Sequence, residues 1–180
     1  MKKAVISVIC ALAALCLFAC GAGDRTASVK PPEQIDVAAL LNEVCAEFGL
    51  TAGERYCSEK ADGAYFFDDD ILAGTYGDLV SDFPEVESMI KYCAFFSSEP
   101  YGPEFGVFIF NDGSDAEDMR KFVDDRMAAL KRNARNYPSV DTSLIDGEYG
   151  AVYGQIYIYS ALGDADKKFE TIFRAAAEEN

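Results

Sequence analysis

Histidine, a common catalytic base and zinc ligand, is absent from the 180 residues of this chain. Without imidazole, neither a Ser-His-Asp nor a Cys-His arrangement can form, and the usual histidine-containing zinc sites are excluded. Ser88-Met89-Ile90-Lys91 has the S-x-x-K spacing of the penicillin-interacting serine enzymes. That chemistry needs these residues at the start of a helix, whereas a predicted strand places Ser88 and Lys91 on opposite faces. We therefore expect no catalytic residue in this motif.

Carboxylates are the second candidate chemistry, since 31 residues are Asp or Glu. Paired carboxylates can hydrolyse glycosidic bonds, so an exported carboxylate-dependent hydrolase acting on cell-wall material stays open as an alternative function. Asp68-Asp69-Asp70 and residues 111–115 could offer oxygen ligands to calcium, but neither stretch has the ligand spacing of an EF-hand loop. The chain also lacks tryptophan, a common platform for sugar rings. We therefore predict no metal site, no cofactor and a non-catalytic protein.

Tyrosine is the remaining residue type that could form a binding site. One predicted hairpin carries Tyr149, Tyr153, Tyr157 and Tyr159. Strand alternation places Tyr157 and Tyr159 on the face opposite Ile156 and Ile158. If uncovered, that face would offer a protein, peptide or glycan a large contact area at a small entropic cost. The alternative is that these rings belong to the core, because tyrosine is favoured in half-buried strands.

The N-terminus predicts export. Lys2 and Lys3 precede an apolar run over residues 4–18, which is too short for a permanent membrane span. The run closes on Leu17-Phe18-Ala19-Cys20, a pattern typical of bacterial lipoprotein signals. We expect Cys20 to become the lipid-modified first residue, carrying fatty acyl groups such as palmitate, on the extracytoplasmic face of the bacterial cell membrane. An ordinary cleaved signal and a short anchor helix are the alternatives.

Composition divides the chain into a signal over residues 1–19, a flexible tether over 20–34 and one globular domain over 35–180. Loss of Lys2 and Lys3 with the signal leaves 14 basic against 31 acidic residues, a formal charge of −17. That charge repels phosphate backbones and anionic lipid headgroups, so we expect no nucleic-acid partner. The expected partners are the membrane, reached through the lipid on Cys20, and a protein at the cell surface.

Cysteine usage gives little support for a disulfide framework. The predicted domain holds three cysteines, Cys45, Cys57 and Cys93, and no C-x-x-C motif. Cys45 lies on the apolar stripe of a predicted helix, where a free thiol serves as a small hydrophobic group. An extracytoplasmic location would permit one bridge, and the pair we would expect is Cys45 with Cys57.

The elements that must position these residues follow from apolar periodicity and capping signals. Predicted helices cover 36–48, 70–76, 114–136 and a C-terminal segment that begins after Asp164. Asp36 is the predicted N-cap of the first helix and Asp164 that of the last, and Ser114-Asp115-Ala116-Glu117 forms a capping box at the start of the third. Predicted strands cover 86–96, 105–110, 148–153 and 155–162. Elsewhere in 51–82 we predict irregular structure. The order α-β-β-α-β-β-α predicts an α+β fold in which an antiparallel four-stranded sheet packs against helices as a two-layer sandwich.

This layout resembles that of the clostridial lipoproteins that carry domain of unknown function 4358. The resemblance rests on the signal and tether, Tyr76-Gly77 before an acidic stretch, Glu104-Phe105-Gly106-Val107-Phe108-Ile109-Phe110, the helix with Met127, and the tyrosine-rich hairpin before a terminal helix. It covers Asp68 to Ala176. The resemblance implies a surface-anchored single domain in a monoderm bacterium, and it brings no activity or catalytic residues.

Overall fold

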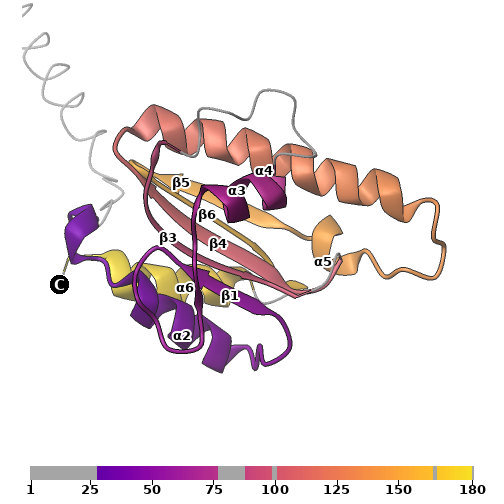
Figure 1. Cartoon of the computed structure of the whole chain (residues 1–180), viewed down its shortest axis with the longest axis horizontal. Coiled ribbons are helices and arrows are strands. Elements are labelled where there is room, and N and C mark those ends of the chain that lie inside the picture. Colours follow the sequence, from indigo (N-terminus) through magenta and orange to yellow (C-terminus); the bar gives the residue numbers. More distant parts are fainter. Residues whose placement is uncertain (1–27, 77–87, 99–100, 164–165, 180) are drawn as a thin grey trace, which may run out of the picture.

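A computed structural model describes residues 28–76, 88–98, 101–163 and 166–179 of the chain (Figure 1). The strands are β1 (Glu54–Cys57), β2 (Tyr65–Phe66), β3 (Ile90–Ser97), β4 (Glu104–Phe110), β5 (Tyr149–Tyr153) and β6 (Ile156–Ala161). The helices are α2 (Val37–Glu47), α3 (Asp69–Tyr76), α4 (Gly113–Ala134), α5 (Ser143–Asp146) and α6 (Asp166–Ala177), with a 3-10 turn, η1, at Pro32–Gln34.

All six strands form one sheet in the order β2-β1-β3-β4-β6-β5. The predicted hairpins β3–β4 and β5–β6 are confirmed, and they pair with each other through β4 and β6. Only the β1–β2 pairing is parallel among the strands described. Every residue of β4 is buried, as the apolar run over 105–110 predicts for a central strand, and the buried residues include the charged Glu104 at its start.

Helices cover both faces of this sheet, so the domain has three layers (Figure 1). Helices α2 and α6 pack on one face around Leu40, Val107 and Phe169. Helices α3, α4 and α5 pack on the other face around Leu72, Phe108 and Met127. The α+β class holds, but the prediction of a four-stranded antiparallel sheet in a two-layer sandwich is wrong in its detail. The helix between the two hairpins covers the face that α2 and α6 leave free.

The two additional strands lie in the stretch predicted to be mainly irregular. Strand β1 has four residues and β2 has two, which is too few for an alternating pattern to show. Pairing with β3 holds β1 in place, with Tyr56 opposite Phe95. The short helix predicted beside them is confirmed as α3.

The cap predicted for the first helix is confirmed, whereas the start of α4 differs from its prediction. Asp36 caps α2 as predicted, since its Oδ1 accepts a hydrogen bond from the Ala39 amide at 2.8 Å. Helix α4 begins one residue earlier than predicted, because Asp112 is its N-cap and accepts from the Ser114 amide at 2.9 Å. Ser114 is therefore not the cap. The expected cap of α6, Asp164, lies outside the described residues.

The segment that leads into the domain lies against the C-terminal end of α6. Val29 forms a β-bridge with Glu178, and the Lys30 amide donates to the Ala177 carbonyl at 2.7 Å. The Lys30 ammonium donates to the Ala176 carbonyl at 2.7 Å. The tether predicted over 20–34 therefore overlaps a segment, 28–34, that packs on the domain. The predicted signal and Cys20 lie outside the described residues, and within the described part no helix is long and apolar enough to cross a bilayer.

Candidate functional site

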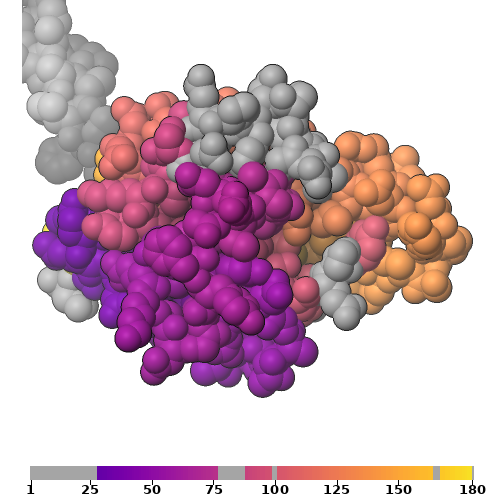
Figure 2. Space-filling view, in the orientation of Figure 1, coloured from indigo at the N-terminus to yellow at the C-terminus, as the bar shows by residue number. Residues whose placement is uncertain are grey.

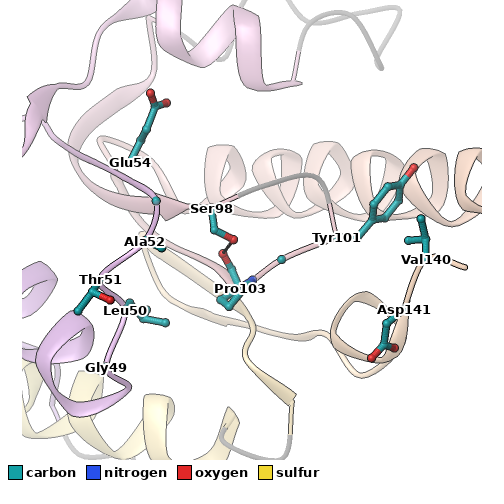
Figure 3. Close-up of a pocket in the computed structure, with 12 residues that line it drawn as sticks. Gly49, Leu50, Thr51, Ala52, Glu54, Ser98, Tyr101, Pro103, Val140 and Asp141 are labelled. Atoms are coloured by element: carbon teal, nitrogen blue, oxygen red, sulfur yellow. Dashed lines mark hydrogen bonds between the residues drawn. The ribbon is translucent and has the colours of Figure 1, made fainter.

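A groove with a volume of about 870 Å³ lies at one end of the sheet (Figure 3). Three connections form it: residues 49–53 after α2, the β3–β4 connection with Ser98 and residues 101–103, and the segment between α4 and α5 with Val140 and Asp141. A volume of this size is within the range that small-molecule sites occupy.

Local backbone geometry shapes the groove. Ser98 donates to the Pro103 carbonyl through both its amide and its hydroxyl, each at 3.2 Å, which closes the β3–β4 connection. Gly53 has a φ of +148°, and a Cβ at this position would lie 2.6 Å from the Phe96 ring. Tyr101 has a φ of +78°, which costs an L-residue about 1 to 2 kcal/mol. That backbone conformation places the Tyr101 side chain beside Val140 at the rim of the groove (Figure 3).

The polar groups that line the groove are hydroxyls and carboxylates. Thr51, Ser98 and Tyr101 supply hydroxyls, and Glu54 and Asp141 supply carboxylates. The Ser143 amide donates to Asp141 Oδ1 at 2.9 Å, and this bond with that of the Ser143 side chain lowers the pKa of the Asp141 carboxyl. Asp141 is therefore charged at neutral pH. Because no Lys or Arg is found among the described lining residues, the groove suits a ligand that donates hydrogen bonds through hydroxyl or ammonium groups.

The tyrosines singled out in the sequence do not form one surface. Tyr157 and Tyr159 face away from Ile156 and Ile158 as predicted, but α4 covers them and each is 1% exposed. The hypothesis that these two rings form an accessible patch is therefore wrong. It fails because the helix between the hairpins packs on this face.

Tyr149 and Tyr153 lie on the opposite face of the sheet, beside α6. The Tyr153 hydroxyl donates to Glu170 Oε1 at 2.6 Å, and its ring centroid lies 5.3 Å from that of Phe173. Both tyrosines are half-buried. Their packing against α6 assigns them to the edge of the core.

A buried ion pair joins β4 to α4. Glu104 accepts hydrogen bonds from Arg126 Nη2 at 2.7 Å and Nε at 3.1 Å, and from the Tyr159 hydroxyl at 2.7 Å. The Tyr76 hydroxyl lies 2.8 Å from the Tyr159 hydroxyl, and Arg126 Nη1 donates to the Thr75 carbonyl at 2.7 Å. Burial, and then the Glu104 charge, raise the pKa of both phenols. With these partners, Glu104 and Arg126 have a structural role that ties α3 and α4 to the sheet.

A smaller hollow of about 350 Å³ lies between α4 and the β5–β6 hairpin. Its charged lining consists of Arg120, Asp124 and Glu148. Glu148 Oε2 is buried without a hydrogen-bond partner, although the Lys131 ammonium lies 3.5 Å away. Burial raises the pKa of Glu148. The sequence analysis does not predict this cleft, because its carboxylates come from α4 and from the residue before β5, 24 positions apart in the chain.

The other sequence candidates have ordinary structural surroundings. Asp68 Oδ1 accepts from the Ile71 amide at 3.0 Å at the start of α3, and no cluster of metal-ligating side chains occurs in the described part of the chain. Lys91 of the S-x-x-K motif lies in β3 and pairs with Glu33 at 2.6 Å. Ser88 precedes that strand, so the motif does not start a helix.

The three described cysteines are free and buried. Cys45 and Cys57 lie in the core beneath α2 and α6, whereas Cys93 faces the other side of the sheet. Burial raises the pKa of all three thiols. The sulfurs therefore serve as small apolar groups in the core.

The fold and this groove define an α+β domain with a loop-lined hollow at one end of a six-stranded sheet. Comparison with models of protein families, with curated proteins and with solved structures finds no match to this chain. Its function must therefore be argued from its geometry.

Proposed function

We propose that this protein is a lipid-anchored binding or accessory protein on the extracytoplasmic face of a bacterial membrane, related to the lipoproteins with domain of unknown function 4358. The groove is its ligand-binding site. One observation carries this proposal: the groove lies at the end of the domain opposite the segment that enters from the N-terminus (Figure 1). Helix α4 runs from one end to the other, and its 22 residues span about 33 Å.

The placement of the groove and the N-terminal segment at opposite ends of the domain suits a protein anchored through Cys20. Residues 20–28 can span at most about 30 Å when extended, so the Val29 end of the domain stays close to the headgroups. The groove then points away from the membrane, toward the cell wall and the proteins around it. Ligands with hydroxyl or ammonium groups, which muropeptides carry, suit its hydroxyl and carboxylate lining.

Filling the groove should abolish ligand binding without unfolding the domain. Ala52 lines the groove and is exposed, so Ala52→Trp places an indole ring in the groove. Ala46→Trp is the matched control, since Ala46 is also exposed but lies on α2 outside the groove. We expect the wild type and Ala46→Trp to bind a muropeptide mixture in saturation-transfer NMR, and Ala52→Trp to lose that signal. Equal binding by all three proteins would contradict the groove assignment.

The Glu148 cleft favours a second candidate function, a carboxylate-dependent hydrolase acting on cell-wall material. A carboxyl group with a raised pKa can act as a general acid, and Asp124 supplies a second carboxylate in the same cleft. This function predicts that the wild type releases soluble fragments from purified cell wall and that Glu148→Gln lowers the release at least about 100-fold. The non-catalytic proposal predicts no release by either protein.

The same substitution tests whether burial raises the pKa of Glu148, on which the catalytic alternative depends. Because the pKa of Glu148 is raised in the folded state, the folded chain holds this proton more tightly than the unfolded chain. The stability of the wild type should therefore fall as pH rises from the unfolded toward the folded pKa. Glu148→Gln should remove that part of the pH dependence in urea unfolding. An unchanged dependence would show that Glu148 is not perturbed by burial.

A further inference from the structure

The outermost strand of the sheet exposes two aromatic side chains. Tyr65 and Phe66 make up β2, and they are 65% and 64% exposed. Figure 2 shows the magenta segment that contains β2 on the face of the molecule turned toward the viewer. Because neighbouring residues of a strand point to opposite faces, Tyr65 lies on the face that carries Tyr56 and Phe66 points to the other face. Large apolar rings exposed at the edge of a sheet are a feature of binding surfaces.

The Tyr65 ring is positioned by the core. Its centroid lies 5.8 Å from that of Tyr56, and the Tyr56 ring stacks on Phe95 at 5.9 Å. Phe95 is fully buried, and the Tyr56 hydroxyl is held by the Glu54 carboxylate. An aromatic row therefore runs from the core to the surface, and the ring at its end loses little entropy when a partner contacts it.

The backbone of β2 adds a second element of recognition. The Phe67 amide donates to the Cys57 carbonyl at 2.8 Å, so in this parallel ladder Phe67 faces β1. Alternation then directs the amide and carbonyl of Phe66 away from β1, along the outer edge of the sheet. An outer edge of this kind is a template for an added strand.

The charges around this edge are mainly negative. A hollow of about 540 Å³ is lined by Phe66, by Ile90, by Lys91 and by the exposed carboxylates of Asp68, Asp69 and Asp70. Lys91 is already paired with Glu33 at 2.6 Å. Glu59 and Asp62, which precede the strand, are also exposed. The surface therefore complements positive charge.

We propose that the β2 edge docks an extended, basic segment of a partner protein by strand addition. Its backbone pairs with the outer edge at Phe66, and its apolar side chains contact Tyr65 on one face of the strand. On the other face its Lys or Arg side chains meet Asp68, Asp69 and Asp70 beside Phe66. The surface is separate from the groove, so this inference stands or falls independently of the groove's function.

The test measures binding of synthetic eight-residue peptides to the full chain in detergent micelles by fluorescence anisotropy. The probe alternates Lys and Val. One reference peptide alternates Glu and Val, and another is the Lys-Val peptide with every second amide N-methylated, which keeps the charge but blocks strand pairing. The variant carries Tyr65→Ser and Phe66→Ser. Its matched control is Tyr137→Ser, because Tyr137 is 61% exposed and lies after α4, away from β2.

We expect the wild type and Tyr137→Ser to bind the Lys-Val peptide equally. The double variant should bind it at least about tenfold more weakly while it still unfolds cooperatively in urea, because both rings are largely exposed. The Glu-Val and N-methylated peptides should bind the wild type at least about tenfold more weakly than the probe. Equal affinity for the Lys-Val peptide and its N-methylated form would overturn strand addition and indicate attraction by charge alone. Equal weakening by Tyr137→Ser would overturn the assignment to β2.

Discussion

Replacing Arg126 by methionine should lower the free energy of unfolding by about 3 to 5 kcal/mol, the cost of leaving a buried charge without its partner. Arg126 donates two hydrogen bonds to Glu104, and both side chains are almost completely buried. After the substitution the carboxylate keeps the Tyr159 hydroxyl and, at 3.2 Å, that of Ser97. These neutral donors cannot replace the guanidinium. Urea unfolding followed by circular dichroism measures the loss.

Two further variants make this test specific. Arg132→Met, at an exposed position of the same helix, should change stability by no more than about 0.5 kcal/mol. Replacing both partners, Glu104→Leu with Arg126→Met, should recover part of the loss because no unpaired charge remains. A loss below about 1 kcal/mol for Arg126→Met alone would contradict the account of Arg126 as the partner that Glu104 requires.

Replacing Cys20 by serine should release the protein from the membrane. The lipid on Cys20 is the proposed attachment, and the mature formal charge of −17 opposes electrostatic binding to anionic headgroups. Fractionation of cells that express the full chain should show the wild type in the membrane and Cys20→Ser in the soluble or secreted fraction. Cys16→Ser is the matched control, since Cys16 lies within the predicted signal and should have no effect.

The opposite outcome has a clear meaning. If Cys20→Ser stays in the membrane fraction to the same extent as the wild type, the N-terminal apolar run is an anchor helix and lipidation is not what holds the protein. Metabolic labelling with a palmitate analogue provides a second readout. Label on the wild type and on Cys16→Ser, but not on Cys20→Ser, is the expected pattern.

The sequence predicts the centre of this fold better than its edges. Strand β4 contains the unbroken apolar run 105–110, and α4 is a 22-residue amphipathic helix, so both have a clear pattern in the sequence. Strands β1 and β2 are too short to show one, and β1 begins with the polar pair Glu54-Arg55. The place of β1 in the sheet depends on pairing with β3, a contact between residues about 40 positions apart in the chain, and β2 joins the sheet by pairing with β1. Such pairing cannot be inferred from local patterns.

The candidate sites could not be predicted from the sequence either, because they too depend on contacts between residues that are distant in the chain. Alternation correctly predicts that Tyr157 and Tyr159 share a face, but their burial depends on where α4 packs. The groove brings together three connections that are far apart in sequence, and its Gly53 and Tyr101 conformations are evident only in three dimensions. In the sequence, the closest signal was the Pro-Tyr-Gly-Pro turn that ends in Pro103.

Photo-cross-linking in intact cells tests the central claim most directly. A photoreactive amino acid at position 52 places the probe in the groove of the lipid-anchored chain, and the same residue at position 46 is the control on α2. We predict one reproducible adduct from position 52, a cell-wall fragment or a single surface protein identified by mass spectrometry, that is absent from position 46. The same adducts from both positions, or none from position 52, would contradict a groove that binds a ligand on the extracytoplasmic face.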